Sequence, residues 1–215
     1  MVEQSRNVLS NQLIMSESNP YLKSLVPNFV NKEDLDACWE ILTSTPKWQL
    51  YTTRVTTKGV EMESTFFRYR FNSKGWHFDE LDETTWFSSF NEWRDEYPEV
   101  FLKIVDQVQS HAGKNYKIWR VGINGTLQGQ TGWIHNDADH VKENAYTHLI
   151  YLNPSWNPLY GGHTSFYNDN LQEIFTILPE SGKLASYDGN VLHTGHAPNI
   201  PNLFRITMTV TGQYM

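Results

Sequence analysis

The stretch NYKIWRVGINGTLQGQTGWIHND, residues 115–137, contains two runs of strand-forming residues, at 115–123 and 132–137, separated by a turn-forming segment. The second run ends in His135 and Asp137. Because side chains alternate between the two faces of a strand, these two residues are expected to project together from one strand end. An imidazole and a carboxylate are suitable first ligands for iron(II) when a third ligand arrives from another strand.

Further short β-rich runs follow this stretch, with Gly, Asn and Pro between them and no helical spacing. These runs lie at 145–152, 163–168, 173–178, 183–188 and 204–212. Short strands at this spacing predict a β-sandwich or barrel.

Helical patterns and two more strand-like runs precede Gly113. A helix is expected from Asn31, which can cap it in a box-like arrangement with Asp34, to Pro46. The other expected elements are strands at 48–55 and 64–71 and helices at 84–96 and from Pro98 to Gly113. We therefore expect a mainly β chain with N-terminal helices, in which a helix layer supports a jelly-roll-like double sheet.

The length and composition set further limits. The chain of 215 residues fits one domain, 1–215, with a loose N-terminus at 1–18, a helical and β support region at 19–112 and a β core at 113–215. The single cysteine, Cys38, excludes an intrachain disulfide. The net charge of −7 argues against stable nucleic-acid binding. Without a membrane-spanning apolar run or a signal-peptide pattern, we expect a cytoplasmic protein with no membrane partner.

Two later residues give His135 and Asp137 a specific context. His193 follows the strand GKLASYD and its Gly-Asn turn, and Arg205 begins the last strand, FRITMTVTGQY. A bare metal site does not need this arginine. A site that holds a dicarboxylate beside the metal does, because guanidinium meets a carboxylate with two parallel hydrogen bonds and is always charged.

Five ordered motifs carry a family resemblance. They are HND at 135–137, YLNPSW at 151–156, GGHTSFY at 161–167, LPESGKLASYDGNVLH at 178–193 and APNIPNLFRIT at 197–207. From about Gln128 to Tyr214 the chain resembles the prolyl 4-hydroxylase-like branch of the iron(II)/2-oxoglutarate-dependent oxygenases. The resemblance implies a double-stranded β-helix of the jelly-roll or cupin-like kind.

The resemblance also implies a dioxygenase that hydroxylates an unactivated C–H bond. His135, Asp137 and His193 would bind Fe(II), and Arg205 would bind the far carboxylate of 2-oxoglutarate. O2 would be consumed, and ascorbate is a further candidate cofactor. Three further positions of this sequence match pocket positions of the family, and their side chains would line the co-substrate site: Thr147, Tyr151 and Thr207.

Several alternatives stay open at this point. His196 competes with His193 as the distal metal ligand, and His148 and His163 are interpreted as structural. A cupin-type metalloenzyme that does not use 2-oxoglutarate and a non-catalytic jelly-roll binding module are the competing classes. The expected partners are 2-oxoglutarate and a peptide or protein substrate, with a prolyl residue as the candidate site of hydroxylation. The substrate pocket is expected to be shaped by 48–80 and 138–146, which carry no motif.

Overall fold

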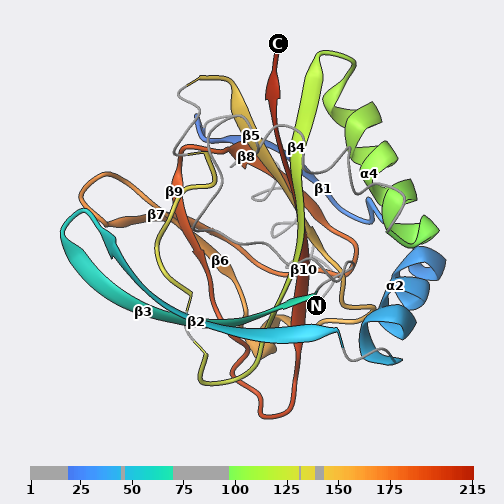
Figure 1. Cartoon of the computed structure of the whole chain (residues 1–215), viewed down its shortest axis with the longest axis horizontal. Coiled ribbons are helices and arrows are strands. Elements are labelled where there is room, and N and C mark those ends of the chain that lie inside the picture. Colours follow the sequence, from blue (N-terminus) through green and yellow to red (C-terminus); the bar gives the residue numbers. More distant parts are fainter. Residues whose placement is uncertain (1–18, 45–46, 70–96, 131, 139–142) are drawn as a thin grey trace, which may run out of the picture.

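Two facing antiparallel sheets and two helices make up the described part of the computed structural model, residues 19–44, 47–69, 97–130, 132–138 and 143–215 (Figure 1). The strand order is β1-β8-β5-β10-β4-β3-β2 in the large sheet and β7-β6-β9 in the small one. The elements are β1 Leu22–Val26, α2 Lys32–Ser44, β2 Trp48–Thr57, β3 Val60–Tyr69, α4 Glu99–Ala112, β4 Tyr116–Thr126, β5 Ala145–Tyr151, the 3₁₀ turn η2 Pro158–Tyr160, β6 Thr164–Tyr167, β7 Glu173–Ile177, β8 Leu184–Asp188, β9 Leu192–Gly195 and β10 Arg205–Tyr214.

The helices α2 and α4 cover one face of the large sheet (Figure 1). Helix α2 begins where expected, because the Asn31 side chain accepts a hydrogen bond from the Asp34 backbone N–H at 2.9 Å. Lys103 of α4 donates to the Asp34 carboxylate at 2.8 Å and so links the two helices. Apolar residues of both helices pack with the outer face of the sheet in the main core: Leu35, Cys38, Leu42, Phe101, Ile104, Val105, Val108, Ile123, Ile150, Leu184, Ile206, Met208 and Val210.

The opposite faces of the same strands form the space between the two sheets. On β10, Ile206, Met208 and Val210 face the helices, so the alternation of side chains directs Arg205 and Thr207 inward. On β5 the same alternation sends Thr147 inward with Leu149 and Tyr151. The apolar part of this interior contains Leu149, Tyr151, Phe166, Ile177, Ala185, Tyr187 and Val191.

The β2–β3 hairpin extends from the end of the large sheet toward the small one (Figure 1). Its turn residues Lys58 and Gly59 have φ angles of 50° and 80°, as a tight primed turn requires. Near the tip, Thr57 Oγ1 donates to the carbonyl of Ile134 at 2.7 Å, and Lys58 pairs with Asp169 at 3.0 Å. This hairpin therefore borders the His135 segment.

The expected elements correspond closely to the observed ones within the described residues. One correction concerns 132–137, which makes a single β-bridge at His135 rather than a strand. Gly132 lies against β9, where a Cβ atom would come within 2.5 Å of Thr194 Oγ1. The expected helix at 84–96, the loose segment 1–18, and parts of the pocket segments, 70–80 and 139–142, lie outside the described residues.

Strands β1 and β9 were not expected from the sequence. Both are short, and both are formed by pairing with distant segments, β1 with β8 and β9 with β6. Within the described residues, neither helix has the length and apolar character that a bilayer crossing requires.

Candidate active site

The two histidines His135 and His193 face each other across a β-bridge. The His135 N–H donates to the His193 carbonyl at 3.0 Å, and the His193 N–H donates back to His135 at 2.8 Å. The Asp137 N–H is fixed in the same way by the Gly189 carbonyl at 2.8 Å. Directly opposed residues of a bridge lie side by side, so the backbone itself brings the two imidazoles together with a ring-centroid distance of 4.5 Å.

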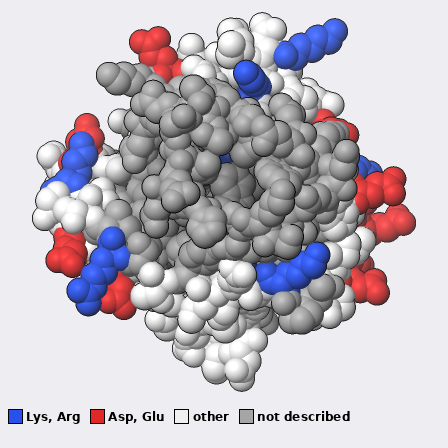
Figure 2. Space-filling model, in the orientation of Figure 1, with Lys and Arg blue, Asp and Glu red and all other residues white. Residues whose placement is uncertain are grey.

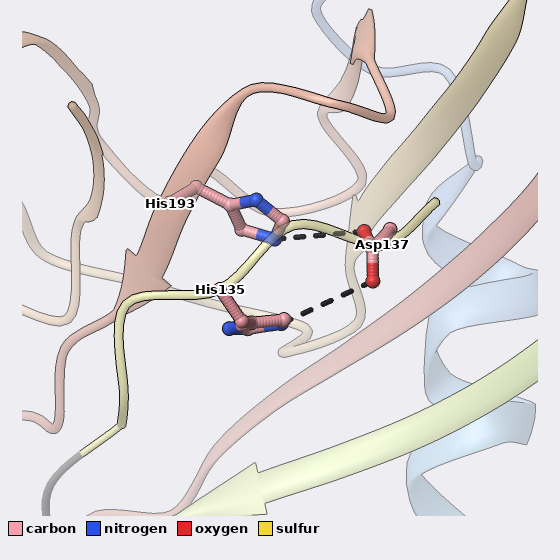
Figure 3. A group of neighbouring side chains, drawn as sticks. All are labelled: His135, Asp137 and His193. Carbon is pink, nitrogen blue, oxygen red and sulfur yellow. Dashed lines mark ion pairs between the residues drawn. The ribbon is translucent and has the colours of Figure 1, made fainter. Parts of the chain in front are cut away.

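The side chains of His135, Asp137 and His193 converge on one point (Figure 3). His135 Nε2 lies 3.9 Å from Asp137 Oδ1, and His193 Nε2 lies 3.5 Å from Asp137 Oδ2. The ligand atoms of all three residues lie within 4.8 Å of one another. The Asp137 and His193 side chains are buried, whereas the His135 side chain is 31% exposed. The site therefore opens toward solvent on the His135 side.

Both histidines present the same nitrogen to the centre. His135 Nδ1 lies 3.0 Å from the Trp133 carbonyl, and His193 Nδ1 lies 3.1 Å from the Val191 carbonyl. A carbonyl can only accept, so each Nδ1 carries a proton, and in a neutral ring Nε2 then has the lone pair. Burial, together with the nearby His193, lowers the pKa of His135 to about 4. Its imidazole is therefore neutral near pH 7, the form that binds a metal ion.

Asp137 is held as a carboxylate by its neighbours. Arg120 forms an ion pair with Oδ1, and Thr147 Oγ1 donates to Oδ2 at 2.8 Å. The Tyr187 hydroxyl lies 3.5 Å from Oδ2 and 3.3 Å from His193 Nε2. Burial alone would raise the pKa of Asp137, but Arg120 and the two histidines outweigh it and hold this pKa well below its usual range.

Arg205 lies inside the double sheet with its guanidinium buried. Its Nε–H donates to the Gly162 carbonyl at 2.6 Å, its Nη2 donates to Thr164 Oγ1 at 3.1 Å, and the Tyr151 ring lies 5.4 Å from its central carbon. Burial lowers the pKa of Arg205, and the adjacent Tyr151 hydroxyl counteracts that shift. Within the described residues no carboxylate pairs with this buried cation. An uncompensated buried charge is costly, so an anionic ligand would suit the pocket.

A second feature near Arg205 is a hydroxyl without a hydrogen-bond partner among the described residues. Thr126 is directly opposite Arg205 in the β4–β10 register, and its Oγ1 is buried without a hydrogen-bond partner among the described residues. The guanidinium of Arg205 has five N–H donors, of which Gly162, Thr164 and the Tyr151 hydroxyl engage three. Free donors beside an unused hydroxyl fit the carboxylate end of a dicarboxylate.

The three pocket positions inferred from the family lie on inward-facing strand positions, with different contacts. The Tyr151 hydroxyl lies 2.9 Å from Thr164 Oγ1 and donates to the Ile177 carbonyl at 3.3 Å. Thr207 is buried and pairs in register with Tyr151. Thr147 instead contacts the group of His135, Asp137 and His193, because its hydroxyl donates to Asp137.

The other histidines named from the sequence, His148, His163 and His196, lie outside this group. His148 points to the helix side of β5, where its Nδ1 lies 2.7 Å from Ser186 Oγ and its ring packs edge-on against Tyr116. His196 stacks on His163 at a centroid distance of 4.1 Å, outside the His135 group. The geometry therefore favours His193 as the distal ligand.

We expect His193→Ala to lose bound iron and His196→Ala to retain it. The reason is that only His193 has its Nε2 beside Asp137, at 3.5 Å. Iron content per folded chain, measured after reconstitution and desalting, gives the comparison. If His196→Ala lost this iron and His193→Ala kept it, the ligand set would have to be reassigned.

Sequence reasoning missed four residues of the site: Arg120, Thr126, Thr164 and Tyr187. Tyr187 and Thr164 stand in motifs already singled out, two positions after Ala185 in LASYD and directly after His163 in GGHTSFY. Arg120 carried a weak signal, a lone cation within the apolar run IWRVGI. A charged residue inside a buried strand needs a partner, and that partner is Asp137.

The sequence matches no protein-family model, and no curated protein matches it significantly. The structure is similar to solved structures over nearly the whole chain. A viral collagen prolyl hydroxylase from Paramecium Bursaria Chlorella virus-1 has a TM-score of 0.52 at 14% identity, covering 93% of this chain and 92% of that one. A prolyl hydroxylase from Trichoplax adhaerens, in complex with a hypoxia inducible factor peptide fragment, has a TM-score of 0.54 at 15% identity, covering 98% and 91%.

HygX from Streptomyces hygroscopicus, solved with nickel and 2-oxoglutarate bound, is also similar. Its TM-score is 0.53 at 8% identity, and the alignment covers 95% of this chain and 87% of that one. At such identities the likeness concerns the fold. The prediction of a mainly β, double-stranded β-helix with a supporting helix layer is confirmed.

Proposed function

We propose that the chain is an iron(II)- and 2-oxoglutarate-dependent oxygenase that hydroxylates an unactivated C–H bond. The observation that carries this proposal is the convergence of His135, Asp137 and His193 in the same double sheet as Arg205, a buried cation that pairs with no carboxylate of the described residues. Two imidazoles and one carboxylate with open positions are the donor set of non-haem iron(II) oxygenases. The similar fold of HygX, which was solved with nickel and 2-oxoglutarate bound, supports the same assignment.

The chain's own residues would hold each component. His135 Nε2, one Asp137 oxygen and His193 Nε2 would bind the iron, and Arg205 with Thr126 would bind the far carboxylate of 2-oxoglutarate. When bound, iron and 2-oxoglutarate supply the oxidising chemistry, with dioxygen consumed and succinate and carbon dioxide released.

The surrounding side chains would fix the orientation of these groups. Arg120 and Thr147 hold the two Asp137 oxygens, and backbone carbonyls hold Nδ1 of both histidines. Such outer partners set the tautomer and direction of metal ligands. The protein therefore contributes preorganisation, and the cofactors contribute the reaction itself.

The substrate that we favour is a prolyl residue in a peptide or protein. Two of the similar structures are prolyl hydroxylases, and one of them holds a peptide. In this chain Trp133 lies beside His135, with ring centroids 4.8 Å apart, and Phe66 of the β2–β3 hairpin packs against Trp133 at 5.5 Å. This aromatic wall at the open side of the His135 group suits the compact apolar ring of proline.

Charge gives less guidance about the substrate. On the face seen in Figure 2, the described acidic and basic side chains lie around the rim with both signs interspersed. The acidic stretch at 79–99 is a candidate docking surface for a basic polypeptide. Its residues 79–96 lie outside the described part of the chain.

The test measures succinate and oxygen transfer together. The purified chain is incubated with 2-oxoglutarate, iron(II), air and proline-containing peptides, and with free proline, nucleosides and nucleic acid in parallel. We expect succinate only when both iron and oxygen are present, and a peptide that gains one oxygen by mass spectrometry. Coupled oxidation of a free amino acid or nucleobase, with every peptide unmodified, would overturn the substrate. If the activity did not depend on iron, or if no activity were found, the cupin-type metalloenzyme or the non-catalytic binding module would be favoured.

A further inference from the structure

A second group of potential metal ligands lies at the small sheet. It consists of His163, directly before β6, Glu173, the first residue of β7, and His196, directly after β9. Their ligand atoms all lie within 4.8 Å of one another. Strand β6 pairs with both β7 and β9, so the sheet itself gathers these three residues from separate parts of the sequence.

The two histidines of this group lie side by side. The His196 N–H donates to the His163 carbonyl at 2.8 Å, and the two rings stack at an interplanar angle of 23°. The hydroxyl of the buried Ser165 lies 3.0 Å from His196 Nε2 and orients that ring. Hydrogen-bond partners of this kind direct imidazoles at metal sites.

We infer that His163, Glu173 and His196 form a second divalent-metal site, selective for zinc and similar borderline ions. Imidazole nitrogen favours zinc, copper, nickel and cobalt over magnesium and calcium, and one carboxylate completes a known zinc donor set. The site does not share a residue with the His135 group, so its metal binding can be measured separately from the proposed oxygenase function.

The state and spacing of the donors agree with this inference. Burial lowers the pKa of both His163 and His196, so their rings are neutral and have a lone pair for a metal at pH 7. Ligand atoms around a tetrahedral zinc ion lie about 3.4 Å apart, given bonds of about 2.1 Å. The group must contract from its present spread, and the stacked rings of His163 and His196 must turn, because lone pairs that lie in two nearly parallel ring planes do not meet at one ion. Both histidines are partly exposed and Glu173 is exposed, so these side chains can rotate to make that adjustment.

A metal ion bound here would stabilise the segments that surround the Arg205 guanidinium. Gly162, whose carbonyl accepts from Arg205, precedes His163 in the sequence. Gly195, whose Cβ position would lie 3.3 Å from Arg205 Nη1, precedes His196. An ion bound to both histidines would thus join the segments on either side of the guanidinium.

Zinc stoichiometry of the full-length chain tests the inference. We expect two zinc equivalents for the unaltered chain by calorimetric titration and metal analysis. Glu173→Gln and His163→Gln should each retain one tightly bound equivalent and weaken the second by more than roughly tenfold. Glu99→Gln, which removes an exposed carboxylate from α4, is the matched control and should keep both.

A variant that lacks the His135, Asp137 and His193 site allows the second site to be measured separately. Asp137→Ala should keep one equivalent of zinc, and cobalt(II) added to it should give visible absorption bands that disappear in Asp137→Ala/Glu173→Gln. Circular dichroism verifies that each variant is folded. Two equivalents retained in both Glu173→Gln and His163→Gln, or no cobalt bands in a folded Asp137→Ala chain, would overturn the second site. Failure of 2-oxoglutarate turnover would leave these measurements unaffected, so the two proposals can fail separately.

Discussion

Replacement of Asp137 or His135 by Ala is expected to abolish 2-oxoglutarate turnover and to reduce bound iron to background. Each change removes a direct ligand from a group of three. Even the loss of an outer hydrogen-bond partner typically weakens metal binding or activity by about 10- to 100-fold, so the loss of a ligand should exceed roughly 100-fold. Succinate formation and iron content per chain are the two measurements.

Two features of the structure make this comparison clean. Asp137→Ala also leaves Arg120 without its carboxylate, which could lower stability, whereas His135 is part-exposed and its removal leaves no unpaired charge. Agreement between the two variants therefore identifies the metal as the cause. Asp36→Ala is the control, because Asp36 is an exposed carboxylate of α2 that pairs only with the equally exposed Lys32 among its described contacts. Iron-dependent turnover retained in both Asp137→Ala and His135→Ala would contradict the assignment of the site.

The parts of the site that follow from short-range periodicity could be predicted from the sequence. The i and i+2 spacing of His135 and Asp137 was enough to place them together, although their segment is a single bridge rather than a strand. The apolar spacing of Leu35, Cys38 and Leu42 likewise accounts for the buried face of α2. In each case the geometry depends on neighbouring positions in one element.

The role of Arg120 could not be predicted in this way, because a β-bulge changes the alternation within β4. The register passes from Thr211 opposite Arg120 to Gly212 opposite Ile118, which leaves Trp119 as the extra residue. Ile118 faces the helix layer. Strict alternation would have sent Arg120 to that side too, whereas the bulge turns it inward to Asp137.

The grouping of His163, Glu173 and His196 could not be predicted from the sequence for a related reason. His163, Glu173 and His196 come together through two strand pairings, and one of these contains a register shift between Phe166 and Tyr167. The strand β9 that positions His196 has four residues, too few for a reliable pattern. A single sequence does not specify such pairings, so His163 was interpreted as structural and His196 as a competitor of His193.

Arg205→Gln is expected to raise the 2-oxoglutarate requirement by about 100- to 1000-fold while iron binding persists. Breaking a buried charge pair by removing one partner costs several kcal/mol, and each 1.4 kcal/mol is about a tenfold change. The hydrogen bonds of Arg205 go to Gly162, Thr164 and the Tyr151 hydroxyl, and none of its described contacts is with His135, Asp137 or His193. The apparent KM for 2-oxoglutarate and iron content are therefore measured on the same preparations.

Thermal stability distinguishes ligand binding from a purely structural role of Arg205. Without 2-oxoglutarate the guanidinium is a buried cation that no described carboxylate pairs with, so Arg205→Gln should not lower the Tm of the ligand-free chain. Saturating 2-oxoglutarate should raise the Tm of the unaltered chain and of the exposed control Arg54→Gln, and should fail to raise that of Arg205→Gln. A lower ligand-free Tm with an unchanged 2-oxoglutarate affinity would mean that Arg205 is structural. The carboxylate would then have to bind elsewhere, with Lys183 as the next candidate, although its ammonium already pairs with Glu180 and donates to the Leu178 carbonyl.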